Sequence, residues 1–446
     1  MSEKFTLVGG GLAGSLMAIY LAKRGYEVHL FERRPDMRSG NYVGGRSINL
    51  ALSVRGITAL ERVGLDKEIL GISIPMSGRK MHDVQGNTSY QPYGKEGQHI
   101  YSVSRGDLNI KLLQLADAYP NIHMYFNHKC VAANLDTCET VFMNEKGEEI
   151  HDKADVVLAT DGAYSAVREE MLHQPRFTYS QTYEQYGYKE LEIVPGANGT
   201  FQIDENCLHI WPRKSFMMIA LPNPGGNFTC TLFYPFDAQP GINDLDSADK
   251  IMDFFNTHFP DAVPMMPNLV DDYINNPTGM LMTVRCYPWT KNNFSLMGDA
   301  AHAVVPFYGQ GMNCSFEDCL VLDDLIAAGR PNKTWNQILN EYQIKRKPNA
   351  DAISNLALQN FVEMRDLVGS PEFLHRKKIE HTLSEKYPNL FISQYERTTF
   401  STRDYAEAFE FGAKNDKVLD AIISNGWESK MDDQAFMIDL LQRTLA

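Results

Sequence analysis

Three glycines at a fixed spacing near the start of the chain limit its fold more than any other feature. Residues 5–8 are apolar and predict a buried strand, Gly9-x-Gly11-x-x-Gly14 follows directly, and residues 12–24 favour a helix. A second strand is predicted over 28–31. In this βαβ order the glycines allow a tight turn, close approach to a pyrophosphate and packing of the helix on the sheet.

An acidic residue follows the second predicted strand. Glu32 comes 18 residues after Gly14, where a carboxylate accepts hydrogen bonds from the hydroxyls of an unphosphorylated ribose, as in FAD or NAD. The first turn of the helix would face the phosphates with unpaired backbone amides. The motif does not choose between FAD and NAD, and a glycine-rich turn without a ligand is the alternative interpretation.

Two later strand-like segments also end in a Gly/Asp pair. Residues 155–160 lead into Asp161-Gly162, and residues 294–297 lead into Gly298-Asp299. A strand-end aspartate such as Asp299 can bind ribityl hydroxyls. The helix that begins near Met312 would direct partial positive charge at the pyrimidine edge of a flavin, where the reduced flavin carries negative charge. This combination favours a flavin over a nicotinamide.

After the first βαβ unit the sequence pattern changes twice, first to strand-like and then to helix-like segments. Residues 207–211, 216–221 and 228–233 predict antiparallel strands, and helices are predicted over 316–328, 335–347, 351–367 and near 435–445. We therefore predict an α/β fold: a Rossmann-like FAD-binding domain, an inserted antiparallel β-sheet domain for the substrate and a C-terminal helical subdomain. The expected boundaries are 1–75 with 98–175 and 285–330 for the discontinuous FAD domain, 76–97 with 176–284 for the sheet domain, and 331–446 for the helical subdomain.

Charge and cysteine usage narrow the class of protein. The net charge of −14 argues against nucleic-acid binding, and seven scattered cysteines without a CxxC pair suggest free thiols in a reducing compartment. Prolines and glycines interrupt the uncharged residues 215–236, so strands fit them better than a membrane span. We expect a cytoplasmic protein without a signal peptide or membrane anchor. No metal is expected, because Cys314 and Cys319 lack further ligands, and the oligomeric state is left open.

The order of the three glycine and aspartate motifs resembles that of single-component aromatic flavoprotein hydroxylases. Residues 45–53, 208–212, 217–223 and 306–313 resemble kynurenine 3-monooxygenases, a family within that class, and the resemblance extends from residue 5 to about residue 410. It implies a tightly bound FAD and a transient NADPH that has no Rossmann domain of its own. Arg33, Arg34 and Arg105 are otherwise read as solvated. The FAD-binding residues that it implies are Gly9, Gly11, Ala13, Gly14, Phe31, Glu32, Arg33, Arg34, Ala51, Arg105, Asp161, Asp299, Gly311, Met312 and Asn313.

The same resemblance implies a substrate with an amino-acid tail. Arg79 and Tyr93 match the family's carboxylate-binding Arg and Tyr, and Asn360 and Tyr395 match its Asn and second Tyr. Residue type alone would make Arg79 a surface charge. An apolar face is expected beneath the substrate ring, partly from a strand with period-two alternation, and simple sheet packing is the alternative. Its members are Leu208, Met217, Ile219, Leu221, Phe233 and Met364.

The resemblance implies hydroxylation of L-kynurenine to 3-hydroxykynurenine by NADPH, O2 and a flavin hydroperoxide, in tryptophan catabolism towards pyridine nucleotides. The substrate's aromatic amine activates the ring, so no catalytic acid or base is assigned, and His302 is read as structural. The alternatives are a hydroxylase of the same fold acting on a phenol or hydroxybenzoate, an NAD dehydrogenase, and a non-catalytic binding protein that lost its flavin. The NADPH docking site, any substrate contact of Tyr308 and the role of residues 411–446 stay open.

Overall fold

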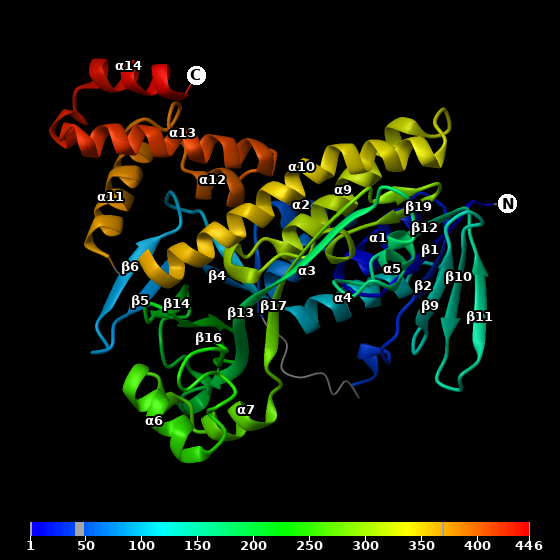
Figure 1. The fold of residues 1–446 in the computed structure, drawn as a ribbon, viewed down its shortest axis with the longest axis horizontal. Coiled ribbons are helices and arrows are strands. Elements are labelled where there is room, and N and C mark those ends of the chain that lie inside the picture. The colour runs from blue at the N-terminus through cyan, green and yellow to red at the C-terminus, as the bar shows by residue number, and fades with distance from the viewer. Residues whose placement is uncertain (1, 41–48, 368–369, 446) are drawn as a thin grey trace. The chain divides into compact units, whose positions relative to one another are not determined.

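The computed structural model describes residues 2–40, 49–367 and 370–445 (Figure 1). The chain divides into two compact units. Unit 1 comprises Met1–Ser73, Val103–Glu184 and Met280–Ser354, and unit 2 comprises Ile74–Ser102, Gln185–Gly279 and Asn355–Ala446. Across the described ranges, every helix is too short or too polar to cross a membrane.

A six-stranded sheet in the order β18-β19-β12-β1-β2-β8 forms the centre of unit 1. β2 lies on one side of β1 and β12 on the other, so the strand order reverses at β1. In open parallel sheets a ligand binds beyond the carboxyl ends of the strands at such a reversal. The parallel strands are β1 (Lys4–Val8), β2 (Glu27–Phe31), β8 (Ile122–Tyr125), β12 (Val156–Ala159) and β19 (Phe294–Leu296), and β18 (Thr290–Lys291) runs antiparallel to β19.

Two helices of unit 1, α1 and α4, contact strands of this sheet. α1 (Leu12–Lys23) is buried along almost its whole length and contacts α4 and α9, which explains why its sequence is apolar on every side. Ser104 caps α4 by accepting the backbone N–H of Asp107 at 3.3 Å. The other elements of unit 1 are β3 (Asn49–Leu52), α2 (Val54–Val63), α3 (Asp66–Gly71), α4 (Arg105–Asp117), β9 (Lys129–Asn134), β10 (Glu139–Met143), β11 (Glu149–Lys153), α5 (Ala166–Leu172), α8 (Asp299–His302) and α9 (Gly311–Gly329). β7 (Ile100–Ser104) carries residues of both units.

The strands predicted between 207 and 233 form the middle of a sheet in unit 2. β14 (Cys207–Pro212), β15 (Met217–Pro222) and β16 (Phe228–Pro235) pair antiparallel. The sheet is nevertheless mixed, because β5 (Gly78–His82) pairs parallel with β14. The remaining strands of this sheet are β6 (Thr88–Pro92), which is antiparallel to β5, and β13 (Thr178–Ile193) and β17 (Gly279–Tyr287), which carry residues of both units. β4 (Ile74–Met76) pairs antiparallel with β7 in another sheet.

The two faces of this sheet differ in what they contact. Met218 and Ala220 of β15 join a core with residues such as Phe255 and Phe259 from the region of α6 (Ala248–His258) and α7 (Leu269–Asn275). Because side chains alternate along a strand, Met217 and Ile219 point to the opposite face. One strand therefore serves both the core and a second surface.

The helical region after residue 330 differs from the prediction. The predicted gap at 348–350 was wrong, because Pro348 lies inside one continuous helix, α10 (Trp335–Val362), and residues predicted as its end form a π-helical turn, Glu363–Leu367. Tertiary packing here outweighs the hydrogen bond that proline cannot donate. α14 (Gln434–Leu445) matches the prediction near 435–445 and packs against α11 and α13 in one apolar cluster. The helices that the sequence pattern missed are α11 (Pro371–Lys386), α12 (Gln394–Thr399) and α13 (Tyr405–Ser424).

Candidate functional site

Three turns from distant parts of the sequence meet at the carboxyl edge of the parallel sheet. A Cβ atom on Gly9 would lie 2.5 Å from the carbonyl oxygen of Thr160 and 2.8 Å from the Cα of Asp161. Gly9 also has a φ of +106°, so both the close contacts and the backbone conformation exclude a side chain there. A Cβ on Gly298 would lie 3.5 Å from the Cβ of Ala13. The structure thus brings the first glycine motif, Asp161 and the Gly298-Asp299 turn together.

The groups at this edge fit FAD. A Cβ on Gly11 would meet no atom within 4 Å, so space is open in front of the first turn of α1, where backbone amides favour a pyrophosphate. Asp299 is exposed at the start of α8. Asp161 accepts the N–H of Ala166 at 2.8 Å with Oδ2, while its buried Oδ1 has no partner among the described residues. Burial raises the pKa of Asp161, as expected for a carboxyl group that awaits a polar ligand.

Glu32 is held beside the glycine turn. Its Oε2 accepts the N–H of Gly10 at 2.8 Å, and its Oε1 accepts the Nε of Arg34 at 2.8 Å. Burial alone would raise the pKa of Glu32, but the hydrogen bonds and charge of Arg34 outweigh it and lower the pKa. The carboxylate is therefore ionised at the expected ribose position. Of the two arginines, Arg34 binds Glu32 and Arg33 is exposed.

The side chain of Asn313 fixes the first turn of α9. Its Oδ1 accepts the N–H of Ser53 at 2.9 Å, and its Nδ2 donates to the carbonyl oxygens of Ala51 (2.8 Å) and Gly309 (2.9 Å). A ligand at this turn would therefore meet backbone amides of Gly311 to Asn313 rather than the Asn313 amide. Ala51 lies in β3; Gly45 to Ile48, in the same motif, lie outside the described residues.

Two other predicted FAD residues occupy different surroundings. The ring of Phe31 stacks on Tyr125 and Phe142, with centroid distances of 4.5 and 3.8 Å, so its side chain belongs to the core of unit 1. Its carbonyl oxygen accepts the N–H of Gly9 at 2.7 Å. Arg105 is exposed at the start of α4. Phe31 thus supports the glycine turn through its backbone.

A buried arginine that the sequence reasoning missed connects two of the turns. Arg168 of α5 is 3% exposed and donates to the carbonyl oxygens of Ala163 at 2.5 Å and Ala300 at 2.8 Å. Ala163 follows Asp161 by two residues, and Ala300 follows Asp299. A long cationic side chain close after an Asp-Gly turn was the available signal, although an exposed arginine would look the same in the sequence.

Arg79 lies beside a stacked pair of tyrosine rings in unit 2. Its Cζ is 5.5 Å from the ring centroid of Tyr93 and 5.2 Å from that of Tyr395, and the two rings are 5.4 Å apart and nearly parallel. Arg79 is 9% exposed, and both its Nε and the hydroxyl of Tyr93 are buried without a hydrogen-bond partner among the described residues. Buried donors of this kind call for an acceptor, and a guanidinium suits a carboxylate.

The charge of Arg79 survives its burial. Burial lowers the pKa of the guanidinium, but the nearby Tyr395, Tyr93 and Glu363 outweigh it and leave the pKa raised. Opposite Arg79 on β6 lies Gln91, whose buried Oε1 also lacks a partner among the described residues. The sequence reasoning did not select Gln91, although it lies two residues before Tyr93. The site therefore presents donors and one acceptor.

The predicted apolar residues lie on the same sheet face as Arg79. Leu208 is opposite Arg79 in the β5–β14 pair, and Met217 is opposite Phe233 in the β15–β16 pair. The π-helical turn that carries Met364 packs on β14. Ile219 and Leu221 follow Met217 at period two, and Asn360 donates from Nδ2 to the sulfur of Met364 at 3.3 Å. All the predicted substrate residues belong to unit 2, and all the predicted FAD residues belong to unit 1.

Comparisons with known proteins agree with this fold. Residues 4–357 match the family model described as FAD binding domain. Among solved structures, p-nitrophenol 4-monooxygenase from Pseudomonas putida has a TM-score of 0.69 at 18% identity and covers 86% of this chain and 94% of its own. An oxygenase of 2-methyl-3-hydroxypyridine-5-carboxylic acid has a TM-score of 0.66 at 20% identity, with coverage of 84% and 95%. The solved structures share the fold of this chain, and the family match shows that it is an FAD-binding flavoprotein.

Curated relatives specify the family. Kynurenine 3-monooxygenase from Myxococcus xanthus is 46% identical over 420 residues, which is 94% of this chain and 90% of the relative. The enzyme of the same name from Flavobacterium johnsoniae is 44% identical and covers 99% of both chains, and that from Dictyostelium discoideum is 44% identical with coverage of 95% and 94%. The chain belongs to the kynurenine 3-monooxygenase family.

Proposed function

We propose that this chain hydroxylates L-kynurenine at the 3-position of its ring, with electrons from NADPH and one oxygen atom from O2. The observation that carries the substrate is the buried Arg79 beside Tyr93 and Tyr395, where the Nε of Arg79 and the hydroxyl of Tyr93 have no hydrogen-bond partner among the described residues and suit a carboxylate. When bound, FAD supplies the redox chemistry that accepts electrons from NADPH and activates O2. The product would belong to tryptophan catabolism.

Unit 2 binds and orients the substrate in this proposal. The Arg79 guanidinium pairs with the amino-acid carboxylate, the Tyr93 hydroxyl donates a hydrogen bond to it, and Asn360 binds a polar group of the tail. The face formed by Leu208, Met217, Ile219, Leu221, Phe233 and Met364 packs on the ring and excludes water, which protects a reactive oxygen donor from hydrolysis.

Unit 1 holds the cofactor in this proposal. The first turn of α1 binds the pyrophosphate, Glu32 binds the adenosine ribose, and Asp299 binds the ribityl chain. Backbone amides of the first turn of α9 face the pyrimidine edge, where they stabilise negative charge on the reduced ring. Asp161 supplies a further polar contact through Oδ1.

One assay tests the substrate. The purified protein should be yellow, L-kynurenine should accelerate NADPH oxidation, and the product should gain one oxygen atom by mass spectrometry. Phenol, 4-hydroxybenzoate and p-nitrophenol serve as comparison substrates. Stimulated NADPH oxidation that yields hydrogen peroxide without hydroxylated product would show that L-kynurenine is an effector, and hydroxylation of a phenol instead would replace the proposed substrate.

The Arg79→Ala variant tests the carboxylate site. Loss of a buried charge-assisted hydrogen-bonding pair costs about 2–5 kcal/mol, so the KM for L-kynurenine should rise roughly 30-fold or more while FAD is retained. Lys80→Ala is the matched control, because Lys80 is the next residue on β5, points to the opposite face and pairs with Asp204 at 2.9 Å. An unchanged KM in Arg79→Ala would remove Arg79 from this role.

A further inference from the structure

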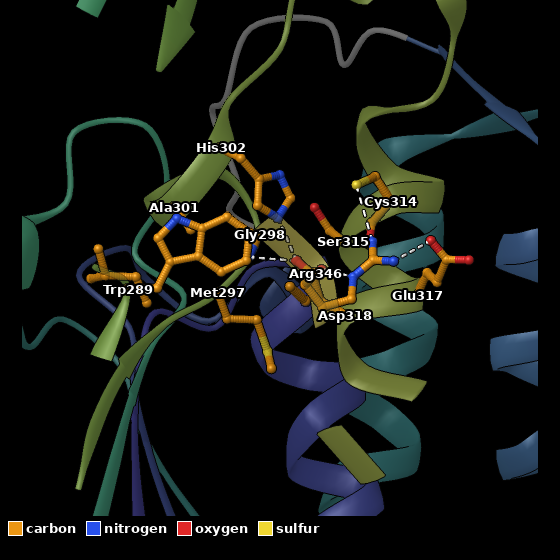
Figure 2. A network of polar contacts seen from close by, with 12 residues as sticks. Trp289, Met297, Gly298, Ala301, His302, Cys314, Ser315, Glu317, Asp318 and Arg346 are labelled. Atoms are coloured by element: carbon orange, nitrogen blue, oxygen red, sulfur yellow. Dashed lines mark hydrogen bonds and ion pairs between the residues drawn. The ribbon is translucent and has the colours of Figure 1, made fainter. Parts of the chain in front are cut away.

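A buried carboxylate on α9 holds both ends of α8, the single helical turn that begins with Asp299. Oδ2 of Asp318 accepts the N–H of Gly298, the residue before this turn, at 3.0 Å, and Nε2–H of His302, its last residue, at 2.6 Å (Figure 2). Asp318 is 0% exposed and His302 4% exposed. The position of α8 therefore depends on one carboxylate.

Arg346 of α10 keeps that carboxylate charged and oriented. Its Nε donates to Oδ1 of Asp318 at 2.7 Å, and its Nη1 donates to Glu317 at 2.5 Å. Glu317 is also paired with the buried Arg55, so two arginines balance two carboxylates. Burial raises the pKa of Asp318, but the charges and hydrogen bonds of His302 and Arg346 outweigh it and lower the pKa.

The turn that Asp318 holds is one the backbone does not adopt readily. Gly298 has φ +59° and ψ −140°, a region accessible essentially to glycine, and a Cβ there would lie 3.1 Å from Oγ of Ser315. Such a conformation persists where the surroundings over-determine it. Arg168 and Cys286 hold the carbonyl oxygens of Ala300 and Ala301 at 2.8 and 3.3 Å. The turn is thus fixed on its inner side, and Asp299 projects from it exposed.

The same cluster does not suit a metal ion. His302, Cys314 and Asp318 offer ligand atoms within 4.8 Å of one another. The Arg346 guanidinium, however, lies 3.3 Å from the sulfur of Cys314 and already pairs with Asp318, so a cation would meet a cation. Burial also raises the pKa of the Cys314 thiol, which disfavours the thiolate that a metal needs. The cluster is a polar support for the turn.

We propose that Asp318 is a positioning residue for FAD: by holding Gly298 and His302 it sets α8 so that the Asp299 carboxylate meets the ribityl chain. The inference rests on the proposed role of Asp299. Because Asp318 is buried, it acts through this turn. Its contacts also tie α8 to α9, whose first turn is the other proposed flavin contact in this region.

The test measures FAD affinity directly. FAD is removed from the full-length protein, and the apoprotein is titrated with FAD while flavin fluorescence is recorded. Asp318→Asn should raise the Kd at least tenfold, because an amide cannot accept from all three donors. Asp323→Asn is the matched control, because Asp323 is a buried carboxylate of the same helix. It pairs with Arg24 at 2.5 Å and Arg62 at 3.1 Å, and neither of these residues belongs to α8. Its Kd should stay within about twofold of the wild type.

A double-mutant cycle separates positioning from general destabilisation. In an Asp299→Ala background, Asp318→Asn should change the Kd less than about twofold further, since its effect passes through Asp299. If Asp318→Asn raised the Kd equally in the wild-type and Asp299→Ala backgrounds, the role of Asp318 would be overturned. The same holds if Asp318→Asn left the Kd of the otherwise wild-type protein unchanged while Asp299→Ala raised it. An unchanged Kd in Asp299→Ala would instead overturn the assignment of Asp299.

A second variant covers the case in which Asp318→Asn does not fold. His302→Phe removes one donor to Asp318, keeps a ring beside Trp289, whose centroid is 5.2 Å from that of His302, and leaves the Asp318–Arg346 pair intact. It should raise the Kd about threefold to tenfold, again without further effect on Asp299→Ala. A Kd equal to that of the wild type would contradict a positioning role for the hydrogen bond between His302 and Asp318 at the end of α8.

Discussion

Burial decides what single residues do in this chain. Arg79 and Arg168 look like ordinary surface cations in the sequence, yet both are buried. Arg79 lies beside two stacked tyrosine rings, and Arg168 connects two turns. Glu32 and Asp318 are carboxylates that stay ionised inside the protein because arginine side chains face them. Pairing of buried charges thus supports the proposed FAD site, whereas the Arg79 Nε in the proposed substrate site has no hydrogen-bond partner among the described residues.

His209 should make stability depend on pH. It donates from Nε2 to the carbonyl oxygen of Asp204 at 2.7 Å and contacts His82 through Nδ1 at 2.8 Å, and His82 in turn contacts Asp261. Burial lowers the pKa of His209 to about 4. The unfolded chain, with an ordinary pKa near 6.5, binds a proton between pH 6.5 and 4 that the folded chain does not.

Above about pH 6.5 His209 is neutral in both states, so its full contribution to the free energy of unfolding is present. As the pH drops to 4, the free energy of unfolding should fall by up to about 3 kcal/mol. Urea unfolding at pH 7 and pH 4.5 measures it. The His209→Gln variant should show a smaller decrease over the same window. A variant with the same decrease as the wild type would assign the pH dependence to other groups.

At the scale of elements, β15 carries two kinds of side chain on one backbone. Met218→Ala should lower the free energy of unfolding by about 2–5 kcal/mol, because Met218 is 0% exposed in the core beneath α6 and α7. Ile219→Ala should instead raise the KM for L-kynurenine several-fold with a smaller loss of stability, because Ile219 lies on the opposite face. Chemical unfolding and steady-state kinetics on both variants check this, and identical profiles would contradict the two-sided role.

The local patterns of the sequence predicted the elements that have local signals. The glycine motif and period-two alternation predicted β1, α1, β2 and the strands between 207 and 233. Pro348 was a misleading signal, because the packing that keeps α10 continuous is not local. The contacts of Arg168, Asp318 and Arg346 join residues far apart in the chain, so no spacing rule could select them. Arg79 and its tyrosines were selected through family resemblance.

At the scale of the molecule, the two proposed ligands belong to different units. FAD should stabilise unit 1 by about 2.7 kcal/mol at a free concentration of 100 times its Kd. Hydrogen exchange with and without FAD should show slower exchange at the carboxyl ends of β1, β12 and β19 and in the first turn of α9. The core of β14 to β16 serves as the internal reference. Protection confined to unit 2 would contradict the assignment of the FAD edge to unit 1.

The parallel sheet also has a consequence for biosynthesis. β1 pairs with β12, and Arg330 pairs with Glu3 across 327 residues of sequence. Arg346 of α10 pairs with Asp318 of α9, which in turn holds Gly298 in the turn that follows β19. A growing chain on the ribosome carries the glycine motif early and the Asp161-Gly162 turn later, but it lacks the Arg346 that holds Asp318 until most of α10 has been made. We therefore expect FAD to bind late in synthesis, after the strands of the parallel sheet have paired, rather than to act as an early nucleus of folding.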